Sequence, residues 1–355
     1  MLGVNPADAA IVLKLLLDVW DQAAERMLAT VIKHLAREID VPEWARAKAQ
    51  ETLALRTELQ AIVNRADALT PRLAVESLEE AYQIGVRAAS IVDKPAVTSR
   101  PEVVQALATR LVANLKGAHV PVIAAHEGMA YKVIADVELG VQAGVATRRE
   151  AVAEAVDKIL LQGDDRFVDK RGHKWHLDAY ARMAGRTTAG QVAVQGQLDT
   201  MVATGRDLVV VSNSPRECPT CRRWEGRLLS VAGATPMGTR VDTLVVTGTV
   251  VEAREDGLWH PNCTHRADPY APGFTRAPRR ETAPKGYEEQ QTLRRLEREV
   301  RALKRRRDAA EQVDKNGPTA RRLRAQVRAK SARIKEHVEA TGQLRKRDRE
   351  QPVGG

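Results

Sequence analysis

All three cysteines of the 355-residue chain lie in two short stretches that share one spacing. Cys218 and Cys221 form a Cys-x-x-Cys pair, and His260 and Cys263 form a His-x-x-Cys pair further along. Each pair encloses a proline, so each is expected to form a tight turn that directs two ligands at one ion. His265 is a fifth possible ligand and competes with His260 for the last position of a tetrahedral shell. The spacing therefore predicts a zinc ion held by the three cysteines and one histidine.

Two other interpretations of these residues compete with a zinc site. A redox Cys-x-x-Cys motif needs a strand before it and a helix after it, and it leaves Cys263 without a role. A chance grouping of small buried residues in turns is less consistent with two matched pairs in a chain that has no other cysteine. Three cysteines cannot all pair, so metal binding in a reducing cytoplasm is favoured over a disulfide framework.

The predicted zinc is structural, because the available side chains can close its ligand shell. A catalytic zinc keeps one open position beside a general base, and Glu225 is the candidate base in that alternative. In the structural interpretation the ion stabilises short strands that contain too little apolar surface to be stable without it. Trp224 and Trp259 are then expected to be core residues beside the metal.

The ligands lie among strand candidates, whereas most of the remaining chain has helical periodicity. The runs RDLVVVSNSP, RLLSVAG and TLVVTG predict strands, and VVEAREDG predicts a short helix that ends at Gly257. Helices are expected from residue 5 to about 92, one of them beginning at Thr70-Pro71. More helices are expected over about 102–116, 121–143, 147–161 and from the turn at Arg171-Gly172 to about 202.

The sequence thus predicts a mainly α protein with a small α+β module stapled by zinc. Only 3% of its residues are aromatic, which favours thin helical packing over one large core. Leucine and valine recur at coiled-coil spacing on both sides of Asn316-Gly317-Pro318, so a C-terminal helical hairpin that packs mostly on itself is expected. The predicted regions are an N-terminal helical region at 1–93, a helical body at 102–204, the zinc module at 205–275 and the basic hairpin at 285–350. No stretch is expected to span a membrane, since AAIVLKLLLDVW is short and interrupted by charge.

The net charge of +10 resides in the C-terminal segment. From Lys285 onward there are 21 Lys and Arg against 11 Asp and Glu, a difference of +10, so the 35 basic and 35 acidic residues before it cancel. Clustered cations neutralise phosphate with little else required, so this tail predicts contact with DNA or with an acidic protein surface. A solvated charged face is the alternative. The tail has no aromatic residue after Tyr287, which argues against base stacking.

The candidate contact residues fall in two runs of the tail, KRRR and RKRDR, and in a polar-aromatic group around Tyr180. They are Arg182, Arg186, Lys304, Arg305, Arg306, Arg307, Arg345, Lys346 and Arg347. For Arg182 and Arg186 a structural role, docking their helix onto the zinc module, is favoured over contact with a phosphate or a carboxylate.

Several stretches of the chain resemble the phage minor capsid protein 2 group, which is related to the MuF-like head morphogenesis proteins. They are ECPTCRRWEGRLLSVAG, VVEAREDGLWHPNCTHRADPYAPG, DDRFVDKRGHKWHLDAYARMAGRTT, GYEEQQTLRRLEREVRALKRR and ATGQLRKRDREQ. The resemblance covers about residues 160–350, and residues 1–150 match only in being helical.

The resemblance implies a minor protein of a tailed-phage head that associates with the portal and other capsid proteins. Such proteins are expected to assist assembly, DNA packaging or ejection, inside the capsid or at the portal vertex, after assembly in the host cytoplasm. The resemblance implies no enzymatic activity and no small-molecule substrate. The alternatives are a zinc-dependent hydrolase or nuclease and a cellular nucleic-acid-binding zinc protein.

Overall fold

The chain folds into two compact units, each assembled from three separate stretches. The computed structural model describes residues 3–6, 8–90, 100–142, 147–214, 218–260, 263–275 and 284–352. The first unit comprises Met1–Leu17, Leu69–Leu115 and Ala181–Glu288, and the second comprises Asp18–Ala68, Lys116–Tyr180 and Glu289–Gly355.

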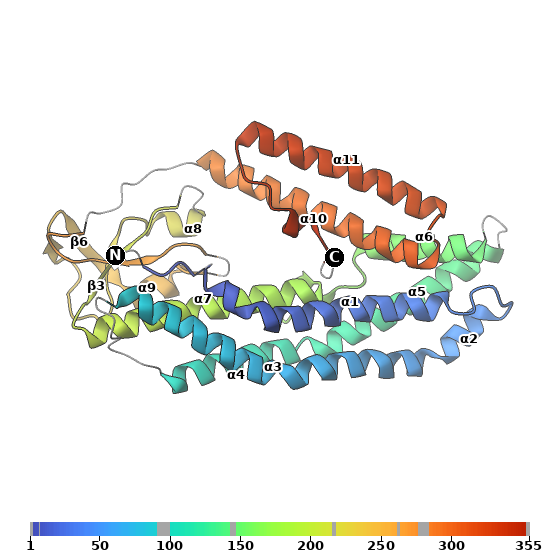
Figure 1. Ribbon diagram of the computed structural model, residues 1–355, viewed down its shortest axis with the longest axis horizontal. Helices are drawn as coiled ribbons and strands as arrows, with labels where there is room; N and C mark the ends of the chain where they lie inside the picture. Colours follow the sequence, from blue (N-terminus) through green and yellow to red (C-terminus); the bar gives the residue numbers. More distant parts are fainter. Residues whose placement is uncertain are drawn as a thin grey trace. The chain divides into compact units, whose positions relative to one another are not determined.

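Helices dominate the described residues, which confirms the mainly α fold class (Figure 1). In chain order the helices are α1 (Lys14–Ala36), α2 (Trp44–Gln50), α3 (Thr52–Ala89), α4 (Pro101–Lys116), α5 (His119–Gln142), α6 (Arg148–Gln162), α7 (Leu177–Ala203), α8 (Pro219–Arg222), α9 (Val250–Glu255), α10 (Pro284–Val313) and α11 (Pro318–Thr341), with 3-10 turns η1 (Asp8–Leu13) and η2 (Arg347–Glu350). The strands are β1 (Phe167–Val168), β2 (Lys174–Trp175), β3 (Leu208–Val211), β4 (Leu228–Ser230), β5 (Arg240–Val241), β6 (Leu244–Thr249) and β7 (Ala267–Pro269). None of the helices in the described ranges has both the length and the apolar character that crossing a membrane requires.

The helix predicted to begin at Thr70-Pro71 does not exist as a separate element. Pro71 lies inside α3, which runs unbroken for 38 residues. A proline inside a helix removes one backbone hydrogen bond, but the loss is tolerated when the buried stripe continues on both sides. Here the stripe continues without a change of phase, through Leu55, Leu59, Val63, Ala66, Thr70, Leu73, Ala74, Leu78, Ala81 and Tyr82. Packing therefore outweighs the local stop signal.

In the first unit, helices α3 and α7 approach each other closely at two glycines. A Cβ atom at Gly85 would lie 1.8 Å from the carbonyl oxygen of Ala193, and one at Gly196 would lie 2.3 Å from that of Tyr82. Only glycine permits this approach of backbone to backbone, since any other residue would clash. The contact holds α7 against α3 shortly before the chain continues into β3.

The first unit also contains a mixed sheet with the strand order β5-β6-β4-β3-β7. Strand β3 pairs antiparallel with both β4 and β7, and β4 pairs parallel with β6. The three predicted strands are β3, β4 and β6. Strand β7 was not predicted, because it is short and ends in Pro269. Its Asp268 accepts a hydrogen bond from the backbone N–H of Gly3 (2.6 Å), which ties the N-terminal segment to the sheet edge.

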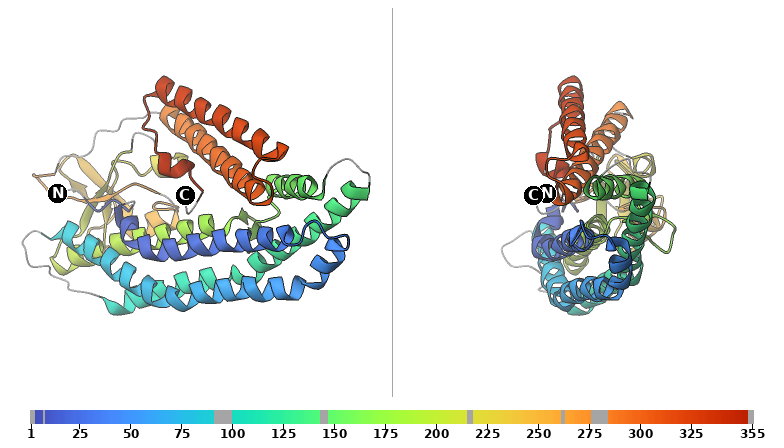
Figure 2. Two further views of the ribbon diagram at one scale, coloured as in Figure 1. Left: turned by 45° about the vertical axis from the view of Figure 1, so that its right-hand side comes forward. Right: turned by 90° about the vertical axis from the view of Figure 1, so that its right-hand side faces the viewer.

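In the second unit, α10 and α11 form the predicted hairpin and lie side by side in Figure 2. The apolar contact between the two helices has two parts. One contains Leu293, Leu296, Val300, Ile334 and Val338, and the other contains Leu303, Ala310, Ala320 and Leu323. Helix α11 also packs on α6. The hairpin thus packs on itself, as predicted, but it packs on the body of its unit as well.

Candidate metal centre

The first pair of cysteines spans one short turn of helix that follows β3. Cys218 is the N-cap of α8, Pro219 occupies the first helical turn, and the Cys218 sulfur accepts a hydrogen bond from the Cys221 backbone N–H at 3.4 Å. Proline in this position is pre-organised for the helix and lacks the N–H that would otherwise be unsatisfied. The turn brings both sulfurs to the same side of the backbone.

The second pair lies in a loop after α9. Gly257 and Trp259 have positive φ angles of 94° and 58°, and the Cys263 backbone N–H donates to the His260 carbonyl at 2.9 Å. The indole N–H of buried Trp259 donates to the carbonyl oxygen of His265 at 2.9 Å and closes the loop. Pro261, the proline of this pair, lies outside the described residues.

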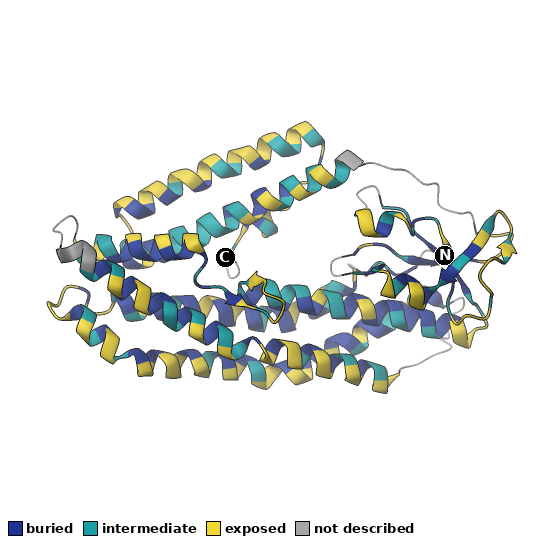
Figure 3. Ribbon diagram, turned by 180° about the vertical axis from the view of Figure 1, so that it is seen from behind, coloured by how far each residue is buried: buried dark blue, intermediate teal, exposed yellow. Residues whose placement is uncertain are grey.

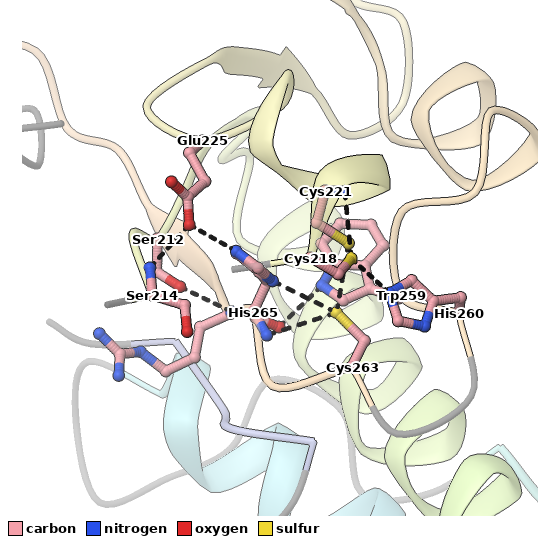
Figure 4. A network of polar contacts seen from close by, with 10 residues as sticks. Ser212, Ser214, Cys218, Cys221, Glu225, Trp259, His260, Cys263 and His265 are labelled. Carbon is pink, nitrogen blue, oxygen red and sulfur yellow. Dashed lines mark hydrogen bonds and ion pairs between the residues drawn. The ribbon is translucent and has the colours of Figure 1, made fainter. Parts of the chain in front are cut away.

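The five predicted ligands converge, as Figure 4 shows. Two trios of ligand atoms, each within 4.8 Å, share Cys221: one adds Cys218 and His260, the other Cys263 and His265. The Cys221 and Cys263 sulfurs are 3.8 Å apart, and Nδ1 of His265 is 3.4 Å from the Cys263 sulfur. Sulfurs placed about 2.3 Å from a tetrahedral zinc are about 3.8 Å apart, and a sulfur and a nitrogen are about 3.5 Å apart. This donor set and its spacing fit a tetrahedral metal ion.

Glu225 contacts the second histidine. Its Oε1 lies 2.7 Å from Nε2 of His265 and accepts a hydrogen bond from the Ser214 backbone N–H, also at 2.7 Å. The Glu225 and His265 side chains are both buried. A carboxylate that accepts from Nε2 leaves the Nδ1 lone pair of a neutral imidazole available for a metal, which is a common arrangement behind metal-bound histidine. Glu225 is therefore placed to orient His265.

The sulfur atoms of the centre influence one another's protonation. The hydrogen bond from Cys221, aided by His265, lowers the pKa of Cys263 to about 4 against the opposing effect of burial. The same contact with Cys263, followed by burial, raises the pKa of Cys221. Burial lowers the pKa of His265, but its hydrogen bonds with Cys263 and Glu225 outweigh burial and raise it overall. These directions favour an anionic Cys263 beside a cationic His265. A divalent cation bound here would change both protonation states.

Comparisons with known proteins place the chain in a family. The family model described as Phage minor capsid protein 2 matches residues 4–339. The chain belongs to this family. The match begins far before residue 160, so the resemblance inferred from motifs was too narrow in extent, and the family match includes the N-terminal region.

This chain of the phage minor capsid protein 2 family is similar to a protein named "Structural protein" from Lactococcus phage LL-H. It is 28% identical over 220 residues, which are 60% of this chain and 58% of the relative. The chain therefore spans a little over half the length of this relative. No solved structure matches this chain significantly.

The two tryptophans beside the metal centre differ in environment. Trp259 is buried, as predicted, and the Arg254 guanidinium lies 5.5 Å from its ring. Trp224 is only half-buried, and its indole N–H donates to the carboxylate of exposed Asp256 at 3.1 Å. The prediction that Trp224 is a core residue was wrong, because its ring lies at the surface, where its indole N–H reaches an exposed carboxylate.

The predicted contact residues of the minor capsid protein are distributed over both units. Arg182 is half-buried and Arg186 is exposed on α7. Lys346 and Arg347 are exposed, whereas Arg345 forms a two-pronged pair with the buried Glu350 at 2.6 Å. All four cations of the 304–307 run are half-buried.

The arginines of that run pair with acidic side chains of their own unit. Arg305 lies 2.8 Å from Asp165, and Arg306 makes a two-pronged pair with Asp157 at 2.6 and 3.1 Å. Sequence reasoning missed these pairs, because no local pattern links a tail arginine to an aspartate near the end of α6.

Proposed function

We propose that this protein is a structural minor capsid component of a tailed-phage head, in the capsid interior or at the portal vertex. It contacts the portal and other capsid proteins and assists assembly, DNA packaging or ejection, after assembling in the host cytoplasm. The observation that carries this proposal is the family match, which extends from residue 4 to residue 339 and so includes helices of both units. The long helices suit a role in protein contacts.

Mass spectrometry of purified phage particles and procapsids tests the role directly. We expect peptides of this protein in both particles, at a stoichiometry far below that of the major capsid protein. Cryo-microscopy of procapsids with and without its gene should then reveal density at or inside the portal vertex. Particles that lack the protein at every stage of assembly would contradict the proposal.

We infer that the metal centre holds one structural zinc ion through Cys218, Cys221, Cys263 and Nδ1 of His265. His265 is favoured over His260 because its other ring nitrogen is held by a buried carboxylate, which fixes both its orientation and its tautomer. Zinc would stabilise this part of the fold, because it would join the α8 turn to the loop that precedes β7. Four protein ligands leave no open position for a water molecule, and Glu225 faces the imidazole in the manner of an orienting group. A hydrolytic role therefore has no support in this geometry.

Alanine variants of the two histidines distinguish the fourth ligand. We expect His265→Ala to lose stoichiometric zinc during dialysis, because one of four ligands is removed and the buried Glu225 carboxylate loses its partner. His260→Ala should retain about one zinc per chain. Glu225→Gln should keep the metal with an affinity about 10–100-fold lower, as is typical when a supporting carboxylate is lost.

Zinc content by mass spectrometry and competition with a colorimetric chelator measure these effects. Loss of zinc in His260→Ala, with retention in His265→Ala, would reverse the assignment of the histidine. If all three variants kept about one zinc per chain, neither histidine would be the fourth ligand.

A further inference from the structure

The four basic side chains of the 304–307 run contact other groups of the same chain. Arg305 and Arg306 pair with Asp165 and Asp157, as described above, and Arg307 pairs with its neighbour Asp308. The ammonium group of Lys304 donates to the side-chain oxygen of Gln351 at 2.8 Å. Paired cations contribute little to the attraction of an external polyanion. The tail surface available to a partner must therefore be sought elsewhere.

Helix α11 carries most of the longest stretch of the tail that has basic residues and no acid. Residues 318–335 contain seven Lys and Arg and no Asp or Glu. Three of the seven are paired within the second unit: Arg322 with Glu154 and Asp157, Arg324 with Glu311, and Lys330 with Glu299. The remaining four are Arg321, Arg328, Arg333 and Lys335, and all are exposed.

Three of these four lie in a line. Arg321, Arg328 and Lys335 are separated by seven residues each, close to two helical turns, so they share one face of α11. Ala325 and Ala332, both exposed, lie between them on the same face. The opposite face holds the buried residues that pack on α10, so the line lies on the exposed face of the helix. Figure 3 shows exposed residues in yellow along α11. We call Arg321, Ala325, Arg328, Ala332 and Lys335 the α11 ridge.

The α11 ridge has the chemistry of a phosphate-binding surface. It spans about 21 Å, or about six base pairs of one DNA strand. Its alanines allow a backbone to approach closely, and its long side chains can reach phosphate oxygens. Arg321 donates a hydrogen bond to the backbone carbonyl of Asn316. Within the described residues, the ion pair of the ridge is Lys335 with Glu339 at 3.8 Å, where both side chains are more than 60% exposed. Such a pair is weak and is readily exchanged for a phosphate.

The same surface is poorly suited to a protein partner. Protein interfaces depend on buried aromatic, methionine or large aliphatic anchors, and the α11 ridge offers only alanine between its cations. It also lacks the aromatic side chains on which unpaired bases stack. We propose that the α11 ridge binds the phosphate backbone of double-stranded DNA without regard to sequence. The assignment rests on the proposed function, in which the protein meets phage DNA inside the head.

A triple variant of the full-length protein tests this surface. We expect Arg321→Gln/Arg328→Gln/Lys335→Gln to bind a fluorescent random-sequence duplex about 10²-fold more weakly than the unaltered chain at 0.1 M salt. Each lost phosphate contact lowers the slope of log affinity against log salt by about 0.9, so the slope should fall by about 2.7. Helicity should stay unchanged, because the three side chains are exposed and glutamine is a good helix former.

A matched control removes three exposed cations from the first unit, in Lys14→Gln/Arg110→Gln/Arg240→Gln. This control should keep the affinity and the salt slope of the unaltered chain to within a factor of about three, since only long-range attraction is reduced. An affinity of the ridge variant equal to that of the control would overturn the assignment of the ridge. Absence of the unaltered protein from phage particles would instead refute the proposed function, whatever the DNA affinity.

Discussion

Replacement of Cys221 by alanine is expected to abolish zinc binding and to unfold the region from about residue 205 to 270. Cys221 belongs to both trios of candidate ligands, so its loss breaks the centre whichever histidine completes it. Structural zinc contributes apparent binding free energies of about 10–16 kcal/mol in small zinc domains, far more than a short sheet gains from apolar burial. The apolar cluster of this sheet contains Leu208, Val210, Leu228, Val246 and Tyr270, with Val241 and Leu244 at its edge.

Metal analysis and limited proteolysis measure the two parts of this prediction. The unaltered protein should carry about one zinc per chain, and a strong chelator should expose the same cleavage sites as Cys221→Ala does. Thr220→Ala is the matched control, since Thr220 lies in the same turn and is exposed. It should keep both the metal and the protease resistance. Zinc near zero in the unaltered protein, when purified without chelator, would contradict the prediction.

Much of the candidate metal centre could be predicted from sequence, because its candidate ligands occur in local pairs. A two-residue gap with an internal proline is a property of a turn, and it does not depend on the rest of the fold. The role of Glu225 could not be predicted in the same way. Its contact with His265 joins residues 40 positions apart, and it depends on how β3, α8 and the loop before β7 meet. Proximity in sequence made Glu225 a candidate base, whereas its contact with His265 supports our proposal that it orients this histidine.

The tail shows the same division between local and distant information. The spacing of apolar residues and the break at Asn316-Gly317-Pro318 predicted both helices of the hairpin, since each signal is local. The partners of Arg305 and Arg306 were not predictable, because a basic run has the same composition whether it faces solvent or an aspartate. A chain truncated near Pro284 would leave Asp157 and Asp165 without these arginines, so we expect it to be destabilised.

The single substitution Arg305→Ala is expected to destabilise the second unit by about 3–5 kcal/mol at neutral pH. The Asp165 side chain is fully buried, and the guanidinium of Arg305 lies 2.8 Å from one of its oxygens. His176 is the other neighbour, with Nδ1 3.2 Å from the same oxygen, and fully buried His126 lies close by. Removing one partner of a buried ion pair leaves an uncompensated charge, which is the source of the large effect.

The pH dependence of this effect identifies the charge as its cause. Burial raises the pKa of Asp165, but Arg305 and then His176 outweigh burial and hold it well below the usual range. Without Arg305 the largest effect that opposes burial is lost, so the folded-state pKa of Asp165 should rise. The destabilisation is then complete at neutral pH and shrinks as the pH falls through the raised pKa, where the carboxyl group takes up a proton.

Urea unfolding of the full-length protein, followed by circular dichroism at pH 7 and pH 5, measures both features. Arg307→Ala is the matched control, since within the described part of the chain Arg307 pairs with its neighbour Asp308, whose side chain is 41% exposed. Its expected effect is below about 0.5 kcal/mol, as for other exposed pairs. Arg305→Met combined with Asp165→Leu removes both charges and should recover most of the lost stability. If Arg305→Ala unfolds at the same urea concentration as Arg307→Ala, the 304–307 run does not anchor the tail. Its cations would then be available to DNA together with the α11 ridge.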